Sequence, residues 1–252
     1  MTSSRSRTAS TPPATPSATP APPATRSGAS RADIHQSIYD AIVEHRLLPG
    51  TKLSEERVAE LFAVSRTQVR GALQRLAVEQ LVTLIPNRGA FVTKPSAEEA
   101  HDVLAVRRTL EPAAVARLIE RIAAGKAPTA IRQLRALVRR EQQAHARGER
   151  RQAVRLSGDF HVLLAELSGS SILARLMREL TPLTCLAILT FEAPTAVACP
   201  NDEHAWLIDA IERGDTDGAA RLMTEHLTHI ESALKLDAQE VGEVDLAEVL
   251  FG

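Results

Sequence analysis

Hydrophobic residues recur every three or four positions over most of this chain, which is the periodicity of amphipathic helices. In the N-terminal part this pattern predicts helices over about 33–46, after Ser54 and after Ser65, and each serine is suited to cap the helix that follows it. The runs 81–85 and 90–93 are rich in β-branched residues, and the Asn and Gly between them are typical of a hairpin turn. This order predicts a helix-turn-helix followed by a two-stranded β-wing.

The remainder of the chain predicts helices packed on helices. Between residues 97 and 236 the apolar positions define successive helical segments separated by breaks that contain glycine or proline, with no convincing strand. We therefore expect a mainly α protein: an N-terminal winged helix-turn-helix with a small β-wing, and a C-terminal antiparallel helical bundle of about six helices.

Composition narrows the class of protein. Aromatic residues make up only 3% of the 252 residues, so the core depends on aliphatic side chains, which favours helices over a β-sandwich or barrel. No apolar run approaches the ~20 residues of a membrane span. Two cysteines are too few for a disulfide scaffold, and we interpret Cys185 as a buried small residue and Cys199 as a loop thiol. A membrane protein, a secreted miniprotein and a disordered chain are excluded.

The net charge of −1 conceals an uneven distribution along the chain. Residues 1–30 carry +3, residues 31–94 carry +2 and residues 95–252 carry −6. The first of these segments is rich in Pro, Ala, Ser and Thr and is predicted to be a disordered tail, whose arginines are candidate helper contacts to DNA. We expect a winged unit over 31–94, a helical domain over 97–236 and an acidic C-terminal tail over 237–252.

The third predicted helix carries the side chains that a DNA-reading helix needs. Arg66, Thr67, Gln68 and Arg70 lie in its first turn and a half, where recognition helices meet the major groove. Arg88, between the two predicted strands, would reach the DNA backbone or the minor groove. Taken singly, these arginines are ordinary solvated charges. Their joint occurrence on one helix-turn-helix and its wing favours DNA binding.

Residues 33–94 resemble the winged helix of the GntR family, through LLPGTKLSEERVAELFAVSRTQVRGALQRLAVEQLV and the following NRGAFV. The resemblance implies a bacterial transcription regulator that binds double-stranded DNA. Gln68 stands where a threonine is frequent, so the base preference need not follow that of any relative. By resemblance, the positions that meet DNA are Arg57, Arg66, Thr67, Gln68, Arg70, Arg88 and Gly89.

Three histidines, His161, His204 and His226, lie on three separate helices of the predicted bundle. Imidazole is a preferred ligand of zinc, nickel and similar ions, and helical bundles build such sites from facing helices. Taken alone, however, histidines at these spacings are more often polar residues on helix surfaces. The histidines that we interpret as surface residues are His35, His45, His101 and His145.

The bundle resembles the ligand-sensing FCD domain of the FadR subfamily, through VRRTLEPAAVARL, DFHVLLAELSGS, EHAWLIDAIERGD and AARLMTEHL in that order. The family holds a metal with one Asp and three His, which implies that His161, His204 and His226 bind a divalent ion of the zinc or nickel type. The Asp position is occupied here by Ser157, a poor metal ligand. Asp159 lies about 200° around the helix from His161 and is predicted to point elsewhere. Either the three histidines hold the metal with water or effector completing its sphere, or the metal has been lost.

Arg107 matches the arginine of the family's R-x-x-L-E block. Its guanidinium is suited to pair with the carboxylate of an effector. The alternative is a surface salt bridge with Glu111, one helical turn away. His229 is a further candidate for the same pocket, although a solvated position is more common for such a residue.

Together these patterns predict a cytoplasmic, homodimeric transcription regulator rather than an enzyme. It would bind an inverted-repeat operator, repress as family members usually do, and be released by a small organic acid. Two alternatives stay open. One is an architectural DNA-binding dimer without an effector. The other is a three-histidine metallohydrolase, for which no acidic general base is placed by motif.

Overall fold

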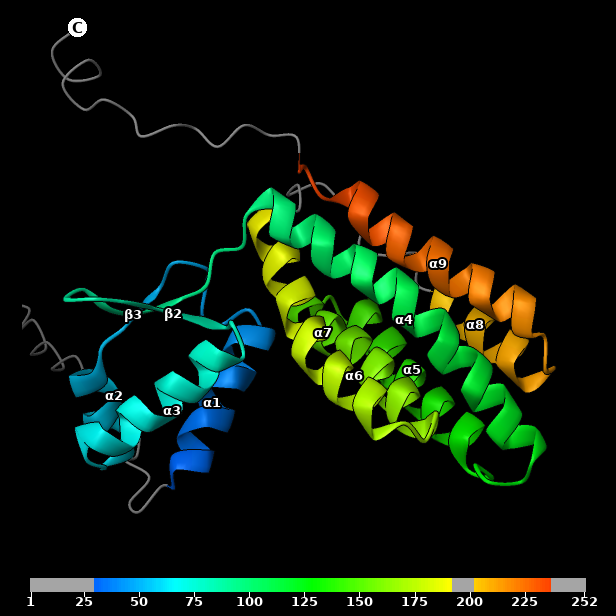
Figure 1. Cartoon of the computed structure of the whole chain (residues 1–252), viewed down its shortest axis with the longest axis horizontal. Helices are drawn as coiled ribbons and strands as arrows, with labels where there is room; N and C mark the ends of the chain where they lie inside the picture. Colours follow the sequence, from blue (N-terminus) through cyan, green and yellow to red (C-terminus); the bar gives the residue numbers. More distant parts are fainter. Residues whose placement is uncertain (1–29, 192–201, 237–252) are drawn as a thin grey trace, which may run out of the picture.

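The computed structural model describes residues 30–191 and 202–236, and these form a small N-terminal unit beside a larger bundle of helices (Figure 1). In the N-terminal unit, serine side chains cap all three helices, as Ser30, Ser54 and Ser65 each accept a hydrogen bond from a backbone N–H in the first turn. The elements of this unit are α1 (Arg31–Val43), β1 (Lys52–Leu53), α2 (Glu55–Phe62), α3 (Arg66–Val78), β2 (Val82–Ile85) and β3 (Gly89–Val92).

The wing is an antiparallel sheet with the strand order β1-β3-β2. Thr83 of β2 and Lys52 of β1 both pair with Phe91 of β3. The β2–β3 turn contains Asn87 at φ 61° and Gly89 at φ 103°, the left-handed backbone that a tight hairpin requires. The sequence predicted this hairpin but not β1, because a two-residue strand is too short to show an alternating pattern.

The larger unit consists of six helices within the described residues, which agrees with the predicted bundle. Helix α4 packs against α7 and α9, while α5 packs against α6 and α8. No helix within 30–191 and 202–236 combines the length and apolar character needed to cross a membrane. The six elements are α4 (Ala97–Ala123), α5 (Ala130–Ala146), α6 (Arg150–Leu167), α7 (Ser171–Phe191), α8 (Glu203–Glu212) and α9 (Thr216–Ala233).

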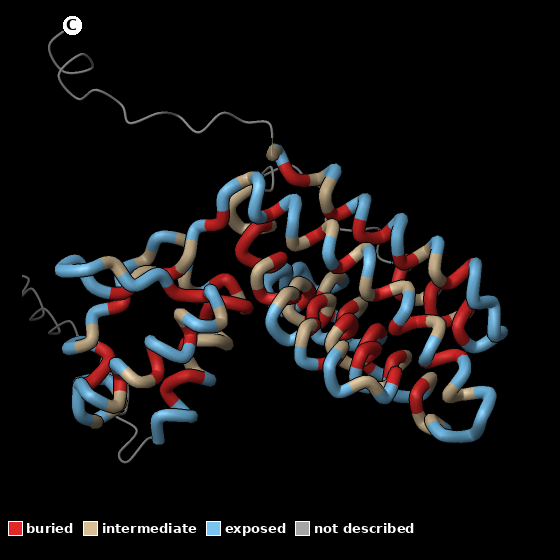
Figure 2. The backbone as a smooth tube through the Cα atoms, viewed as in Figure 1, coloured by how far each residue is buried: buried red, intermediate tan, exposed pale blue. Residues whose placement is uncertain are grey.

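Each unit has its own buried core, visible as inward-facing buried stripes along the helices (Figure 2). The exception to this separation is α7. Its Leu186 is fully buried within the core of the N-terminal unit, and Leu183 packs against the same cluster, as does Tyr39 of α1. Helix α7 therefore lies among the bundle helices in the sequence, but its side chains contribute to both cores.

Two of the histidines predicted to lie on the surface are buried, so that part of the prediction is wrong. His35 and His45 are each only 7% exposed. His35 is covered because its Nε2 lies 2.7 Å from Oε2 of Glu79 and its ring stacks on Tyr39. Cys185 is buried, as expected. Cys199, most of the N-terminal tail and the acidic C-terminal tail lie outside the described residues.

Candidate nucleic-acid interface and candidate metal centre

Helix α3 begins with a capping box that involves one of the predicted DNA contacts. Ser65 Oγ accepts the backbone N–H of Gln68 at 3.3 Å, and Gln68 Oε1 accepts the backbone N–H of Ser65 at 3.2 Å. The Gln68 side chain is therefore folded back on the start of the helix. Its first role in this structure is to stabilise α3, which the assignment as a base contact did not anticipate.

Arg66 and Arg70 are exposed at the start of α3, and both lie near Glu55 of α2. The Arg70 guanidinium donates two hydrogen bonds to Glu55, from Nε to Oε1 at 2.9 Å and from Nη2 to Oε2 at 2.8 Å. Arg66 Nη2 lies 4.0 Å from the same carboxylate. The hydrogen bonds from Arg70 lower the pKa of Glu55 despite its partial burial. The sequence did not identify Glu55 as a partner, because the pair spans the turn between two helices.

The remaining predicted DNA contacts also lie on the surface. Arg57 is exposed on α2 and pairs with Glu60 at 3.0 Å, and Thr67 is exposed on the first turn of α3. Arg88 and Gly89 are exposed at the wing tip, where the Arg88 Cζ lies 5.9 Å from the ring centroid of Phe91. The predicted arginines of α2, α3 and the wing thus all lie on the surface of the N-terminal unit, where they are exposed to solvent.

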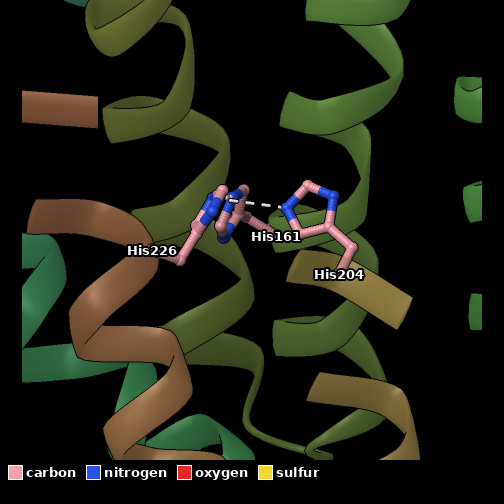
Figure 3. Close-up of side chains that lie close together, drawn as sticks. All are labelled: His161, His204 and His226. Carbon is pink, nitrogen blue, oxygen red and sulfur yellow. Dashed lines mark hydrogen bonds between the residues drawn. The ribbon is translucent and has the colours of Figure 1, made fainter. Parts of the chain in front are cut away.

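The three predicted ligand histidines converge in the interior of the bundle, from α6, α8 and α9 (Figure 3). The Nε2 atom of His226 lies 3.2 Å from that of His161 and 3.3 Å from that of His204. One ligand atom from each of the three side chains can be chosen so that all lie within 4.8 Å of one another. The side chains are buried, with 2%, 5% and 2% exposure for His161, His204 and His226. The reading of these residues as helix-surface polar groups is wrong.

Each of these imidazoles is oriented by a glutamate. The Nδ1 atoms of the three rings lie 2.5 Å from Glu111 for His161, 2.9 Å from Glu141 for His204 and 2.6 Å from Glu203 for His226. A ring whose Nδ1–H donates to a carboxylate directs the lone pair of Nε2 toward the other two rings. Carboxylates behind ligand histidines are the usual outer partners of metal sites. The sequence did not identify these glutamates as partners of the histidines, because each comes from a different helix than its histidine.

The pKa values of His161 and His226 agree with the same arrangement. Burial lowers the pKa of His161 to about 4 and that of His226 to about 3, so both rings are neutral near pH 7. Burial by itself raises the pKa of Glu111, but Arg107 and His161 outweigh it and bring the value to about 2. Neutral rings that donate through Nδ1 have only lone pairs to offer at the centre. Such a donor set fits a divalent cation better than mutual hydrogen bonds.

Ser157 occupies the position at which the resemblance to the FCD family implies an aspartate ligand. Ser157 lines the same cavity as His161, one turn earlier on α6. Asp159 is exposed, and its Oδ2 lies 3.9 Å from Nε of Arg155, away from the histidines. Among the described residues, the group suited to hold a metal consists of His161, His204 and His226 alone.

Arg107 is buried beside this cluster, and the alternative of a surface salt bridge is wrong. The pair with Glu111 exists, with Nε donating to Oε1 at 2.7 Å, but both side chains are almost fully buried. Nη1 of Arg107 donates to Oγ1 of Thr184 at 2.9 Å. Its Nη2 has no hydrogen-bond partner within the part of the chain that the structure describes.

A cavity of about 330 Å³ adjoins these groups. Arg107, Ser157 and His161 line it together with residues of α5, α7 and α9. His229 is part of the wall, with an exposed ring whose Nδ1 lies 2.5 Å from Glu203. The bundle therefore contains a cavity lined by the Arg107 guanidinium, by His161 of the three-histidine cluster and by apolar side chains, an arrangement suited to bind a small anion-bearing molecule.

Comparison with known proteins gives two adjacent family matches. The model described as "Bacterial regulatory proteins, gntR family" matches residues 30–92, and the model described as "FCD domain" matches residues 102–229. The HTH-type transcriptional repressor RspR of Escherichia coli is 28% identical over 212 residues, which cover 82% of this chain and 91% of that protein. The Uxu operon regulator of Haemophilus influenzae is 26% identical over 221 residues, covering 80% and 77%.

Solved structures agree with these matches. A putative transcriptional regulator GntR from Rhodococcus sp. RHA1 superimposes with a TM-score of 0.71 at 25% identity, covering 80% of this chain and 95% of that one. Escherichia coli McbR/YncC shares the fold, with a TM-score of 0.68 at 20% identity over 79% of this chain and 93% of that one.

Proposed function

Since this chain belongs to the GntR family of bacterial regulatory proteins and carries an FCD domain, we propose that it is a homodimeric repressor that leaves its operator when a small carboxylate binds the bundle. It is a transcription regulator rather than an enzyme, so the metallohydrolase alternative is set aside. Its GntR helix-turn-helix implies DNA binding and its FCD domain implies binding of a small molecule. The repressor role rests on the name of the relative RspR. A regulator of the chromosome would act in the bacterial cytoplasm.

In this proposal α3 reads the major groove and the wing contacts the backbone or the minor groove. Arg66 and Arg70 are the base-reading candidates, because a guanidinium suits guanine in bidentate geometry. In the protein without DNA the Arg70 guanidinium donates to Glu55, and an acceptor on the DNA would replace that carboxylate. Thr67, Arg57, Arg88 and Gly89 are the candidate contacts to phosphates and sugars. Gln68 contributes by capping the helix that presents them.

The bundle is the proposed sensor. His161, His204 and His226 would hold a divalent ion of the zinc or nickel type, and such an ion would supply a Lewis-acidic anchor for a carboxylate oxygen. Arg107 is the proposed partner of the same carboxylate, since its Nη2 has no hydrogen-bond partner among the described residues. Ser157 leaves this wall without the negative charge that the family's aspartate would bring.

The observation that carries the proposal is the double role of α7. Thr181, Thr184 and Cys185 of this helix line the cavity, while Leu186 is buried in the core of the winged helix and Leu183 packs against that core. A ligand that changes the position of α7 therefore acts on both units. Regulation follows only if the ligand binds the DNA-competent and DNA-incompetent dimers with different affinity. A two-fold dimer would recognise an inverted repeat.

The test begins with selection of operator DNA from a random library by the full-length protein. Carboxylates are then added to the complex, and release is followed by fluorescence anisotropy. We expect an inverted-repeat site and at least one carboxylate that lowers operator affinity about tenfold or more, which corresponds to a coupling free energy of about 1.4 kcal/mol. Tight binding that no carboxylate changes, together with an absence of bound metal, would favour the architectural alternative.

A further inference from the structure

The cavity wall offers a carboxylate one cationic side chain. Arg107 is the one arginine or lysine among the described residues that line the cavity. Its Nε and Nη1 already donate to Glu111 and Thr184, which leaves Nη2. Oγ1 of Thr181, which lines the same cavity and is more than nine-tenths buried, likewise has no partner among the described residues. An N–H and an O–H donor without partners match the two oxygens of a carboxylate.

In the proposed function the ion and Arg107 hold the same carboxylate, so a second carboxylate on the ligand finds no arginine or lysine of its own among the described residues of the wall. Glu141 also lines the cavity, and its negative charge would repel an additional anionic group. His145 and His229 belong to the wall as well, but His229 is already paired with Glu203. The cavity is partly open to solvent, since His229 and Ser232 of its wall are exposed, but a second carboxylate held against the apolar wall loses hydration without gaining a partner, so a dicarboxylate or tricarboxylate is disfavoured.

Carbon makes up most of the surface of the cavity wall. The hydroxyl of Thr184 accepts from Arg107 and donates to the carbonyl of Leu180, and the hydroxyl of Ser232 donates to the carbonyl of His229. The hydroxyl protons of Thr184 and Ser232 are therefore already donated within the protein and are not available to the hydroxyl groups of a polyhydroxylated ligand. The apolar residues of the wall include Val154, Ile188, Ile230 and Leu234.

The volume limits the size of the apolar part. Cavities of about 150 Å³ accept benzene. A cavity of about 330 Å³ therefore accommodates a carboxylate together with a compact aliphatic or aromatic body, of about six to ten carbons in all.

From these four observations we propose that the effector is a monocarboxylic acid with a compact apolar body, rather than a dicarboxylic, tricarboxylic or sugar acid. The inference rests on the proposed function, which requires only that some small carboxylate binds. The carboxylate pairs with Arg107 and Thr181, and the body packs against the wall formed by Val154, Ile188 and Ile230.

The experiment compares matched probes on the zinc-loaded full-length protein by isothermal titration calorimetry. Phenylacetate and 4-methylpentanoate represent the proposed class. Glutarate adds a second carboxylate, gluconate adds hydroxyl groups, and phenylacetamide removes the charge of phenylacetate. We expect the two apolar acids to bind at least about tenfold more tightly than the other three probes.

Variants then locate the binding site. Ile188→Ala enlarges the apolar wall, so the preferred chain length in a series of straight-chain acids should increase by one or two carbons, with roughly fourfold in affinity for each added methylene that is buried. Val106→Ala, on the exposed side of α4, should leave the preference unchanged.

The outcomes separate the two proposals. Tight binding of glutarate or gluconate with weak binding of the apolar acids would overturn the assigned class and leave the proposed function intact. Equal binding of phenylacetamide and phenylacetate would overturn the pairing with Arg107. Failure of every carboxylate to bind would overturn the inference together with the carboxylate part of the proposed function.

Discussion

Arg155 of α6 lies across the junction between the two units and pairs with Asp40 of α1, with Nη2 and Oδ1 3.1 Å apart. The same guanidinium contacts Glu44 and lies 3.9 Å from Asp159. Hydrogen bonds from Arg46 and Arg155 outweigh partial burial and lower the pKa of Glu44. Helix α6 also carries His161, so one helix joins the three-histidine cluster to the winged helix by charge, as α7 joins the cavity to it by apolar packing.

A double-mutant cycle of Arg155→Ala and Asp40→Ala measures this junction. The pair is partly exposed, so we expect a coupling free energy of about 1 kcal/mol in urea unfolding. Arg178 and Glu166 form a more exposed pair within the bundle and serve as the matched control, with a coupling of about half that value or less. Additive single-mutant effects at Arg155 and Asp40 would show that the junction contributes nothing to stability.

Replacement of Arg66 and Arg70 by alanine tests the recognition helix. Each substitution should weaken operator binding about 10- to 100-fold, and the double variant should lose specific binding, since a bidentate base contact is worth about 1–3 kcal/mol. Arg178→Ala removes the same charge from the bundle surface and should bind DNA normally. Sedimentation velocity checks that the oligomeric state is unchanged. Normal operator affinity of the double variant would contradict the assignment of α3.

The substitution Ser157→Asp, which introduces the aspartate implied by the resemblance to the FCD family, tests the proposed metal site. Residue 157 lines the cavity beside His161, so an added carboxylate should tighten zinc binding about tenfold, or by about 1.4 kcal/mol. Competition with a chromophoric chelator measures this change. Asp159→Asn is the matched control and should have no effect, because Asp159 points toward Arg155. If zinc affinity is the same in wild type and Ser157→Asp, the site is not where we propose.

The glutamates behind the imidazoles offer an independent test. Glu141→Gln weakens the acceptor that orients His204, and zinc affinity should fall about 10- to 100-fold. Glu225→Gln alters an exposed carboxylate next to His226 in sequence and should leave zinc affinity unchanged. Equal losses in both variants would indicate a general electrostatic effect rather than orientation of the ring.

His45 makes stability depend on pH. Burial, with further contributions from Arg150 and Arg151, lowers its pKa from 6.5 to about 4. As the pH falls from 6.5 toward 4, His45 becomes protonated in the unfolded chain but stays neutral in the folded chain. The free energy of unfolding therefore decreases over this range. His45→Asn keeps a residue that tolerates the φ of 58° and removes the titrating group. Between pH 7.5 and 5.0 the wild type should lose about 2 kcal/mol more of its free energy of unfolding in urea than the variant does, and equal losses would contradict the assignment.

Local patterns along the chain were sufficient to predict the type and order of nearly all elements. Ser54 and Ser65 marked the starts of two helices, and the Asn and Gly of the wing marked its hairpin, because capping and turn conformations depend on neighbouring residues. The three histidines were identified by the resemblance to FCD domains. Strand β1 was missed because its two residues are held by pairing with β3 rather than by any pattern of their own.

The partners of the functional residues were decided by tertiary structure. Glu55 meets Arg70, Glu141 meets His204 and Glu203 meets His226 only because different helices pack side by side. No spacing in the sequence encodes these pairs, since the residues of each pair belong to different helices. The sequence by itself determined which helices form and which side chains could bind DNA or metal. The packing of those helices decided which charges are buried, which donors of Arg107 are left without a partner, and which helix connects the cavity to the winged helix.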